Sequence, residues 1–174
     1  PKFFWDASAE FLGINDTAPT RRLSVNSAGI QIVARFESSS ATSARIGLVD
    51  ANTTGDNFVN VAAVGDDMAL YAGAAERVRI DSLGNVGIGE SDPSGYWSQA
   101  NQLVIEDGNC GLTLKSAVSG VGRLVFTDTK STTAGLNDGG MISYNHADDA
   151  MIVQTVGDEA MRIDASGNLL SGTG

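Results

Sequence analysis

The stretch that organises this sequence reads Arg79-Ile80-Asp81-Ser82-Leu83-Gly84-Asn85, and it returns 83 residues later as Arg162-Ile163-Asp164-Ala165-Ser166-Gly167-Asn168. The same offset relates Met68-Ala69-Leu70 to Met151-Ile152-Val153. A third, looser copy lies at residues 5–14. An internal repeat at a fixed spacing is typical of a chain built from similar modules. The sequence therefore predicts an array of modules rather than one enzyme domain.

The repeat also sets the expected domain boundaries. In two copies, a Gly-Ile step (Gly13-Ile14 and Gly87-Ile88) is followed by a proline five residues after the isoleucine. We expect residues 1–19 to be the closing strand of a preceding module, residues 20–93 to be a first β-module and residues 94–174 to be a second. Because the sequence starts without Met and stops where the next Gly-Ile step is due, we interpret it as a segment of a longer polypeptide.

The apolar segments are short, and many alternate with polar residues, as in Arg77-Val78-Arg79-Ile80. A period of two suits strands that bury one face. We therefore expect Val78 and Ile80 to face the core, and Arg77 and Arg79 to face solvent or an acidic neighbour. Clusters of Asp, Asn, Ser and Gly between these segments supply tight turns. In one of them, we expect Asp81 to accept hydrogen bonds from the backbone around Gly84. Strands that recur with no helical pattern between them predict an all-β fold. Beyond residues 1–30, the predicted strands lie at 31–36, 45–49, 58–62, 69–71, 77–80, 103–105, 112–114, 123–127, 141–144, 151–155 and 161–163.

Composition limits the possible functions. The 174 residues include 21 Gly, 3 Pro and 42% apolar residues, which indicates an ordered chain with many tight turns. The net charge of −10 disfavours binding to nucleic acid, where phosphate charges must be neutralised. No stretch approaches the roughly 18 apolar residues of a membrane-spanning helix, so we expect no membrane insertion.

Modules of this size are marginal on their own. A chain of about 80 residues buries only about 60–65% of the surface that it exposes when unfolded. The lone cysteine, Cys110, excludes an internal disulfide. We therefore expect stacking or oligomerisation to supply the missing burial. We also expect Cys110 and Trp5 to be buried as apolar side chains.

The run Asp81-Ser82-Leu83-Gly84-Asn85-Val86-Gly87-Ile88-Gly89-Glu90-Ser91-Asp92-Pro93 resembles a signature of bacteriophage tail-fibre and related trimeric adhesin proteins. Residues 4–14 are similar to a second form of the same motif. The resemblance implies tandem short-strand β-modules in an elongated, parallel homotrimeric fibre, on a virion or otherwise outside the cell. The implied function is structural and adhesive: a segment of a tail fibre or receptor-binding fibre, which presents or contacts a host-surface glycan or protein receptor.

Two other functions stay open. A bacterial cell-surface trimeric adhesin would have the same architecture. A polysaccharide-depolymerising tailspike would need a long groove with paired carboxylates, and the 21 acidic residues single out no such pair. We therefore expect a protein that is not an enzyme and has no catalytic residues.

Three motifs could carry other chemistry, and each has a simpler interpretation. Val86-Gly87-Ile88-Gly89 lacks the third glycine and the following helix of a dinucleotide-binding loop. Residues 50–56 place oxygen ligands at calcium-loop spacing, but Val61 stands where a Glu is required, so we expect an Asx-rich turn. His146 is the only histidine, and we expect it in a solvated loop. No metal and no cofactor are expected.

The candidate binding residues are the adjacent aromatics Tyr96 and Trp97, which follow Pro93. If they are exposed, their rings could stack on a sugar of a host glycan. Alternatively, they fill the joint between two modules, as large aromatic side chains often do.

The Gly-Ile steps offer a second structural prediction. Glycine removes a side chain where backbones must approach closely. Gly13 and Gly87 would then let three chains meet around an axis, with Ile14 and Ile88 stacked inside. The alternative is that these glycines only form bulges in a monomeric sandwich.

Overall fold

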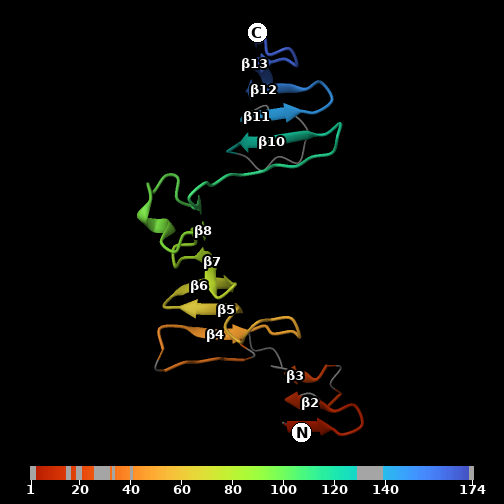
Figure 1. Ribbon diagram of the computed structural model, residues 1–174, viewed down its shortest axis with the longest axis vertical. Coiled ribbons are helices and arrows are strands. Elements are labelled where there is room, and N and C mark those ends of the chain that lie inside the picture. Colours follow the sequence, from red (N-terminus) through yellow and green to blue (C-terminus); the bar gives the residue numbers. More distant parts are fainter. Residues whose placement is uncertain are drawn as a thin grey trace. The chain divides into compact units, whose positions relative to one another are not determined.

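The computed structural model describes residues 3–14, 17–18, 21–25, 32, 34–39, 41–128 and 139–172. Within these ranges the chain forms fourteen strands and one short 3-10 helix (Figure 1). The predicted all-β fold is therefore confirmed. The chain divides into two compact units, Pro1–Cys110 and Gly111–Gly174.

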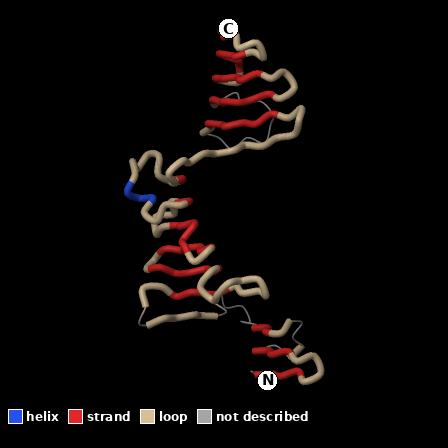
Figure 2. The backbone as a smooth tube through the Cα atoms, viewed as in Figure 1, coloured by secondary structure: helices blue, strands red, loops and turns tan. Residues whose placement is uncertain are grey.

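The strands form three sheets, in which each strand lies beside its neighbours in the sequence (Figures 1 and 2). The first sheet contains β1 (Phe3–Asp6), β2 (Phe11–Ile14) and β3 (Leu23–Val25). The second contains β4 (Ala44–Gly47), β5 (Val59–Val64), β6 (Asp67–Ala72), β7 (Ala75–Ile80), β8 (Val86–Ile88) and β9 (Leu103–Ile105). The third contains β10 (Val121–Phe126), β11 (Gly140–Asn145), β12 (Ala150–Thr155), β13 (Asp158–Ile163) and β14 (Leu169–Ser171).

Two of the strand pairs are parallel, β2 with β3 and β8 with β9, and the others are antiparallel. A parallel pair needs a crossover connection. Residues 89–102 make this connection between β8 and β9 and contain the 3-10 helix η1 (Pro93–Gly95). The expected module boundary between residues 93 and 94 thus lies inside a connection within the second sheet. Residues 3–14, expected to close a preceding module, form the β1–β2 hairpin.

The 83-residue repeat is present in the strand register as well as in the sequence. The β6–β7 hairpin and the β12–β13 hairpin have equivalent pairs and an irregularity at the same place, directly after the third pair. Both hairpins close through two residues with positive φ, a type I′ turn whose twist suits the flanking strands. The matching pairs are Met68–Ile80 with Met151–Ile163, and Leu70–Val78 with Val153–Met161; the turns are Gly73-Ala74 and Val156-Gly157.

The next turn of each repeat is built around an aspartate. The Oδ1 atom of Asp81 accepts the backbone N–H groups of Leu83 (2.9 Å) and Asn85 (2.8 Å), and its Oδ2 atom accepts the Asn85 side chain (2.8 Å). Asp164 accepts the equivalent three bonds, each at 2.9 Å, from Ser166 and Asn168. The predicted role of Asp81 as the acceptor of its own turn is confirmed, and the second copy repeats it.

Within the described residues, the buried apolar side chains are small. They are Ala62, Ala69, Val104 and Ala150, and the largest fully buried side chain is Pro93. Two burial predictions are wrong for the single chain, because Trp5 is 55% exposed and Cys110 is exposed. The single chain therefore has no core of large aliphatic side chains among these residues.

Two predicted strands are also not found. Residues 112–114 have no strand partner, although their apolar alternation suits one. In the segment 31–36, residues 31 and 33 lie outside the described residues, and the others form no strand. A strand requires a neighbour to accept its backbone hydrogen bonds, and the side-chain pattern does not identify that neighbour.

The aspartate turns predict a loss of stability in acid. Desolvation is the largest influence on Asp81 and raises its pKa, but the bonds from Asn85 and Leu83 outweigh it, so the pKa lies below its usual value. The side chain and backbone N–H of Asn168 likewise lower the pKa of Asp164. Because the folded pKa values are lowered, this stabilisation is present above about pH 4, the unfolded pKa, and is lost as the pH falls through the folded values.

We therefore expect the free energy of unfolding, measured by urea titration, to fall as the pH is lowered from 5 to 2. The double variant Asp81→Asn/Asp164→Asn, which cannot titrate at these positions, should be less stable at pH 6 and lose less stability in acid. An unchanged pH slope in the double variant would show that these turns do not contribute.

Candidate functional site

One face of the second sheet is apolar across all six strands. Residues directly opposite each other on neighbouring strands point to the same side of a sheet. Two rows of such residues lie on one side, because they are two positions apart along each strand. The first row is Ile46, Val61, Leu70, Val78, Ile88 and Ile105; the second is Ala44, Ala63, Met68, Ile80, Val86 and Leu103. We call these twelve residues the apolar face of the second sheet.

The other two sheets have the same arrangement. In the first sheet, six apolar residues occupy the paired positions of one side: Phe3, Trp5, Leu12, Ile14, Leu23 and Val25. In the third sheet, the corresponding residues are Leu124, Ile142, Tyr144, Met151, Val153, Met161, Ile163 and Leu169. Each sheet therefore has an apolar face, and the three faces come from the same strand pattern.

These apolar faces are open in the single chain. On the second sheet, Leu70 and Ile88 are more than a third exposed, and Leu103 is 56% exposed. On the third sheet, Ile142 and Met161 are exposed to a similar degree. Side chains of this kind are worth about 1.5–3 kcal/mol each when fully buried. Covering these side chains with other apolar groups would therefore stabilise the protein substantially.

The opposite face of the second sheet is covered instead, and the chain's own loops cover it. The side chain of Asn60 is buried there and donates to the carbonyl of Asn57 at 2.8 Å. A Cβ atom at Gly87 would overlap the carbonyl oxygen of Glu90, the second residue of the crossover connection. The crowding expected at Gly87 is thus present, but its source is the chain's own connection, on the side of the sheet opposite Ile88.

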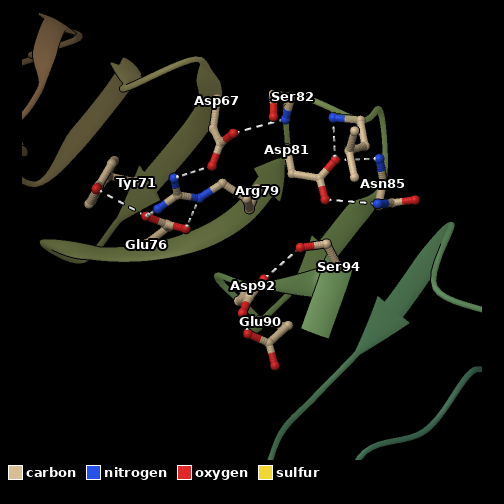
Figure 3. A network of polar contacts seen from close by, with 11 residues as sticks. Asp67, Tyr71, Glu76, Arg79, Asp81, Ser82, Asn85, Glu90, Asp92 and Ser94 are labelled. Atoms are coloured by element: carbon tan, nitrogen blue, oxygen red, sulfur yellow. Dashed lines mark hydrogen bonds and ion pairs between the residues drawn. The ribbon is translucent and has the colours of Figure 1, made fainter. Parts of the chain in front are cut away.

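A charged network lies on this covered face (Figure 3). Arg79 is only 8% exposed, and its Nε and Nη2 atoms donate to the two carboxylate oxygens of Glu76 at 2.7 and 2.6 Å. Its Nη1 atom donates to Asp67 at 3.0 Å, while the other oxygen of Asp67 accepts the Ser82 backbone N–H at 2.9 Å. The hydrogen bonds with Glu76 raise the pKa of Arg79, so the guanidinium stays charged. The network connects β6 and β7 to the turn before β8.

The prediction for the side chains of β7 is therefore only half right. Arg79 faces acidic neighbours, as expected. However, it is the arginine that is buried, whereas Val78 and Ile80, expected in the core, lie on the apolar face and are partly exposed. Alternation showed which residues share a face, but the covering loops decide which face is buried.

Tyr96 and Trp97, the predicted binding residues, lie in the crossover connection just after η1. The Tyr96 hydroxyl donates to Glu90 Oε2 at 2.9 Å, and Glu90 Oε1 accepts the Asp92 backbone N–H at 2.6 Å. The bond from the Asp92 N–H, followed by the bond from the Tyr96 hydroxyl, lowers the pKa of the Glu90 carboxyl. The bond to Glu90 raises the pKa of Tyr96. Trp97 is 69% exposed. The connection is thus held by internal bonds and presents two exposed aromatic side chains, of which Tyr96 lies beside the Glu90 carboxylate.

Other motifs have structural roles in this fold. The loop that begins at Asp50 is an Asx turn, as predicted: the carboxylate accepts the Asn52 N–H (3.0 Å) and the Thr53 hydroxyl (2.7 Å). His146 is exposed in the β11–β12 turn, as expected, with its ring 4.9 Å from that of Tyr144. Among the described residues, no three His, Cys, Asp or Glu side chains come together as a metal site would require. None of the helices described there could span a membrane.

Comparison with protein-family models and with curated proteins found no match for this chain.

The repeat provides an internal control for the Arg79 network. In the third sheet, Arg162 makes the equivalent bonds to Glu159 at 2.9 and 2.8 Å, but Ala150 occupies the position of Asp67, and the pair is more exposed. Arg79→Ala leaves two mostly buried carboxylates unpaired and should cost about 3 kcal/mol. Arg162→Ala should cost clearly less, because solvent screens its more exposed ion pair. Urea unfolding of both variants measures the difference, and equal costs would show that burial of Arg79 does not matter.

Proposed function

We propose that this chain is a structural and adhesive segment of a homotrimeric fibre of the tail-fibre type, in which the apolar faces of three copies pack against one another. The observation that carries the proposal is the apolar face that each sheet leaves open. Three copies in the same direction would bring equivalent faces together at every level of the repeat. The number three and the parallel direction come from the sequence resemblance.

The placement of the crossover connection supports the adhesive part of the proposal. Residues 89–102 begin on the covered face of the second sheet, as the crowding between Gly87 and Glu90 shows. If the apolar face is turned toward other copies, this connection lies on the side turned away from them. Tyr96 and Trp97 would then stay exposed in the fibre, where they can contact a receptor on a host surface.

The assembly is tested by placing a charge on an apolar face. Leu70→Lys and Val153→Lys change equivalent positions of the two repeats. In the proposed trimer, each variant would bury three lysines in the interface, one from each copy. Leu83→Lys is the matched control, because Leu83 lies exposed in the turn after β7. Light scattering of the unchanged chain should give three times 18.0 kDa. The two face variants should lose the trimer and the control should keep it; a stable monomer of the unchanged chain would contradict the proposal.

The adhesive part is tested separately. The Trp97→Ala and Tyr96→Ala variants should assemble like the unchanged protein in light scattering, because neither residue lies on an apolar face. Both variants should lose binding to an array of bacterial surface glycans. Val118→Ala is a suitable control, since Val118 is an exposed residue of another loop. Full binding by the Trp97→Ala variant would exclude the aromatic pair as the contact, while the structural proposal would stand.

A further inference from the structure

A segment with the residue pattern of a strand lies beside the third sheet without joining it. Leu112 and Leu114 alternate with Thr113 and Lys115, as in a strand with one apolar side. The backbone groups of these four residues make no hydrogen bond in the part of the chain that the structure describes. Leu112 is 67% exposed and Leu114 is 49% exposed. The segment therefore has donors, acceptors and an apolar side for a partner strand.

The second sheet has a similar segment before its first strand. Residues 34–37 alternate between apolar and charged side chains, and their backbone groups also make no hydrogen bond within the described ranges. Phe36 lines a hollow together with Met68 of the apolar face, and Leu114 lines one together with the equivalent Met151. In both repeats, an unpaired segment thus borders an apolar face.

The first strand of the third sheet has an open edge. Among the described residues, β10 pairs only with β11. The His146 N–H donates to the Gly120 carbonyl at 3.0 Å, and in an antiparallel pair every second residue then bonds to the same neighbour. The backbone groups of Arg123 and Val125 therefore point away from β11. This edge can accept one more strand.

The chain's own segment is close to this edge but does not pair with it. A Cβ atom at Gly122 would lie 3.9 Å from the Leu114 Cβ atom, yet no backbone hydrogen bond joins the segment to β10. In the single chain, water can bond to both sets of groups. When the apolar face packs against other copies, the segment at its border loses this water, and its backbone groups need partners in the protein.

A neighbouring copy offers the pairing that the chain's own β10 does not make. In copies that run parallel and in register, residues 112–115 of one copy lie at the same level as the β10 edge of the next. The apolar side formed by Leu112 and Leu114 also suits the apolar face to which Leu124 of β10 belongs.

We propose that residues 112–115 of one copy pair with the outer edge of β10 in a second copy, so that neighbouring copies of the fibre exchange this segment. The inference rests on the proposed fibre and adds backbone pairing to the contact between apolar faces. Leu112 and Leu114 of one copy extend the apolar face of the other beyond β10.

Photo-cross-linking in the full chain identifies what the segment contacts. One photoreactive phenylalanine analogue replaces Thr113, between the two leucines. Irradiation should join two chains into a product of twice 18.0 kDa on a denaturing gel. Mass spectrometry of this product should find the analogue linked to residues 121–126. The same analogue in place of Leu83, which is exposed in the turn after β7, is the matched control and should leave single chains.

Amide hydrogen exchange provides a second measurement. The N–H groups of Thr113 and Leu114 should exchange at least about tenfold more slowly in the assembled protein than in the Val153→Lys variant, which should be monomeric. The reason is that these groups are unbonded in the single chain and bonded in the exchanged pair.

Two results would overturn the exchange and leave the proposed fibre intact. In the first, light scattering gives the trimer, but the analogue at Thr113 forms no product with residues 121–126 of another copy. In the second, Thr113 and Leu114 exchange equally fast in the trimer and in the monomeric variant. A stable monomer of the unchanged chain would instead contradict the fibre itself, and the exchange with it.

Discussion

The alternation of side chains between the two faces of a strand is the constraint on which the rest of this structure depends. Where strands pair in a fixed register, alternation separates the side chains of a sheet into two sets. In the second sheet one set is apolar, and the other contains mainly small, polar and charged residues. The first and third sheets also have one largely apolar set, but their other sets include large apolar side chains such as Phe11, Ile152 and Leu170. The chain's own loops cover the second set in the second sheet, so the apolar set is left for another surface.

This choice of covered face explains several features together. Gly87 lacks a side chain because the backbone of Glu90 lies over it. Arg79 can be buried because Glu76 and Asp67 neutralise its charge and accept its hydrogen bonds. Ala62 and Ala69 are buried and small, which allows the loops to approach the sheet closely. The covered face is thus built for contact with backbone and loops, whereas the apolar face is suited to contact with other apolar side chains.

Much of the fold could be predicted from the sequence, because strand pattern and turn chemistry are local. The repeat, the aspartate turns and most strands follow from residues close together, such as Asp81 and Asn85. The burial of Arg79 and the exposure of Trp5 could not be predicted in this way, since alternation does not show which face the loops cover. Residues 112–114 have a strand pattern without a strand partner. Tyr96 and Trp97 could be selected as a candidate contact from the sequence, but their fixed and exposed position depends on the bonds of Glu90 with Asp92 and Tyr96.

Methionine oxidation tests most directly whether the apolar faces are covered in the assembled protein. Met68, Met151 and Met161 lie on these faces and are more than a third exposed in the single chain. Brief treatment of the native protein with hydrogen peroxide, followed by mass spectrometry of its peptides, measures their accessibility. We predict that all three are oxidised at least about tenfold more slowly than in the urea-unfolded chain, because other copies exclude solvent and oxidant from them. Oxidation at the unfolded rate in the native protein would contradict the account, since it would show that the apolar faces stay open.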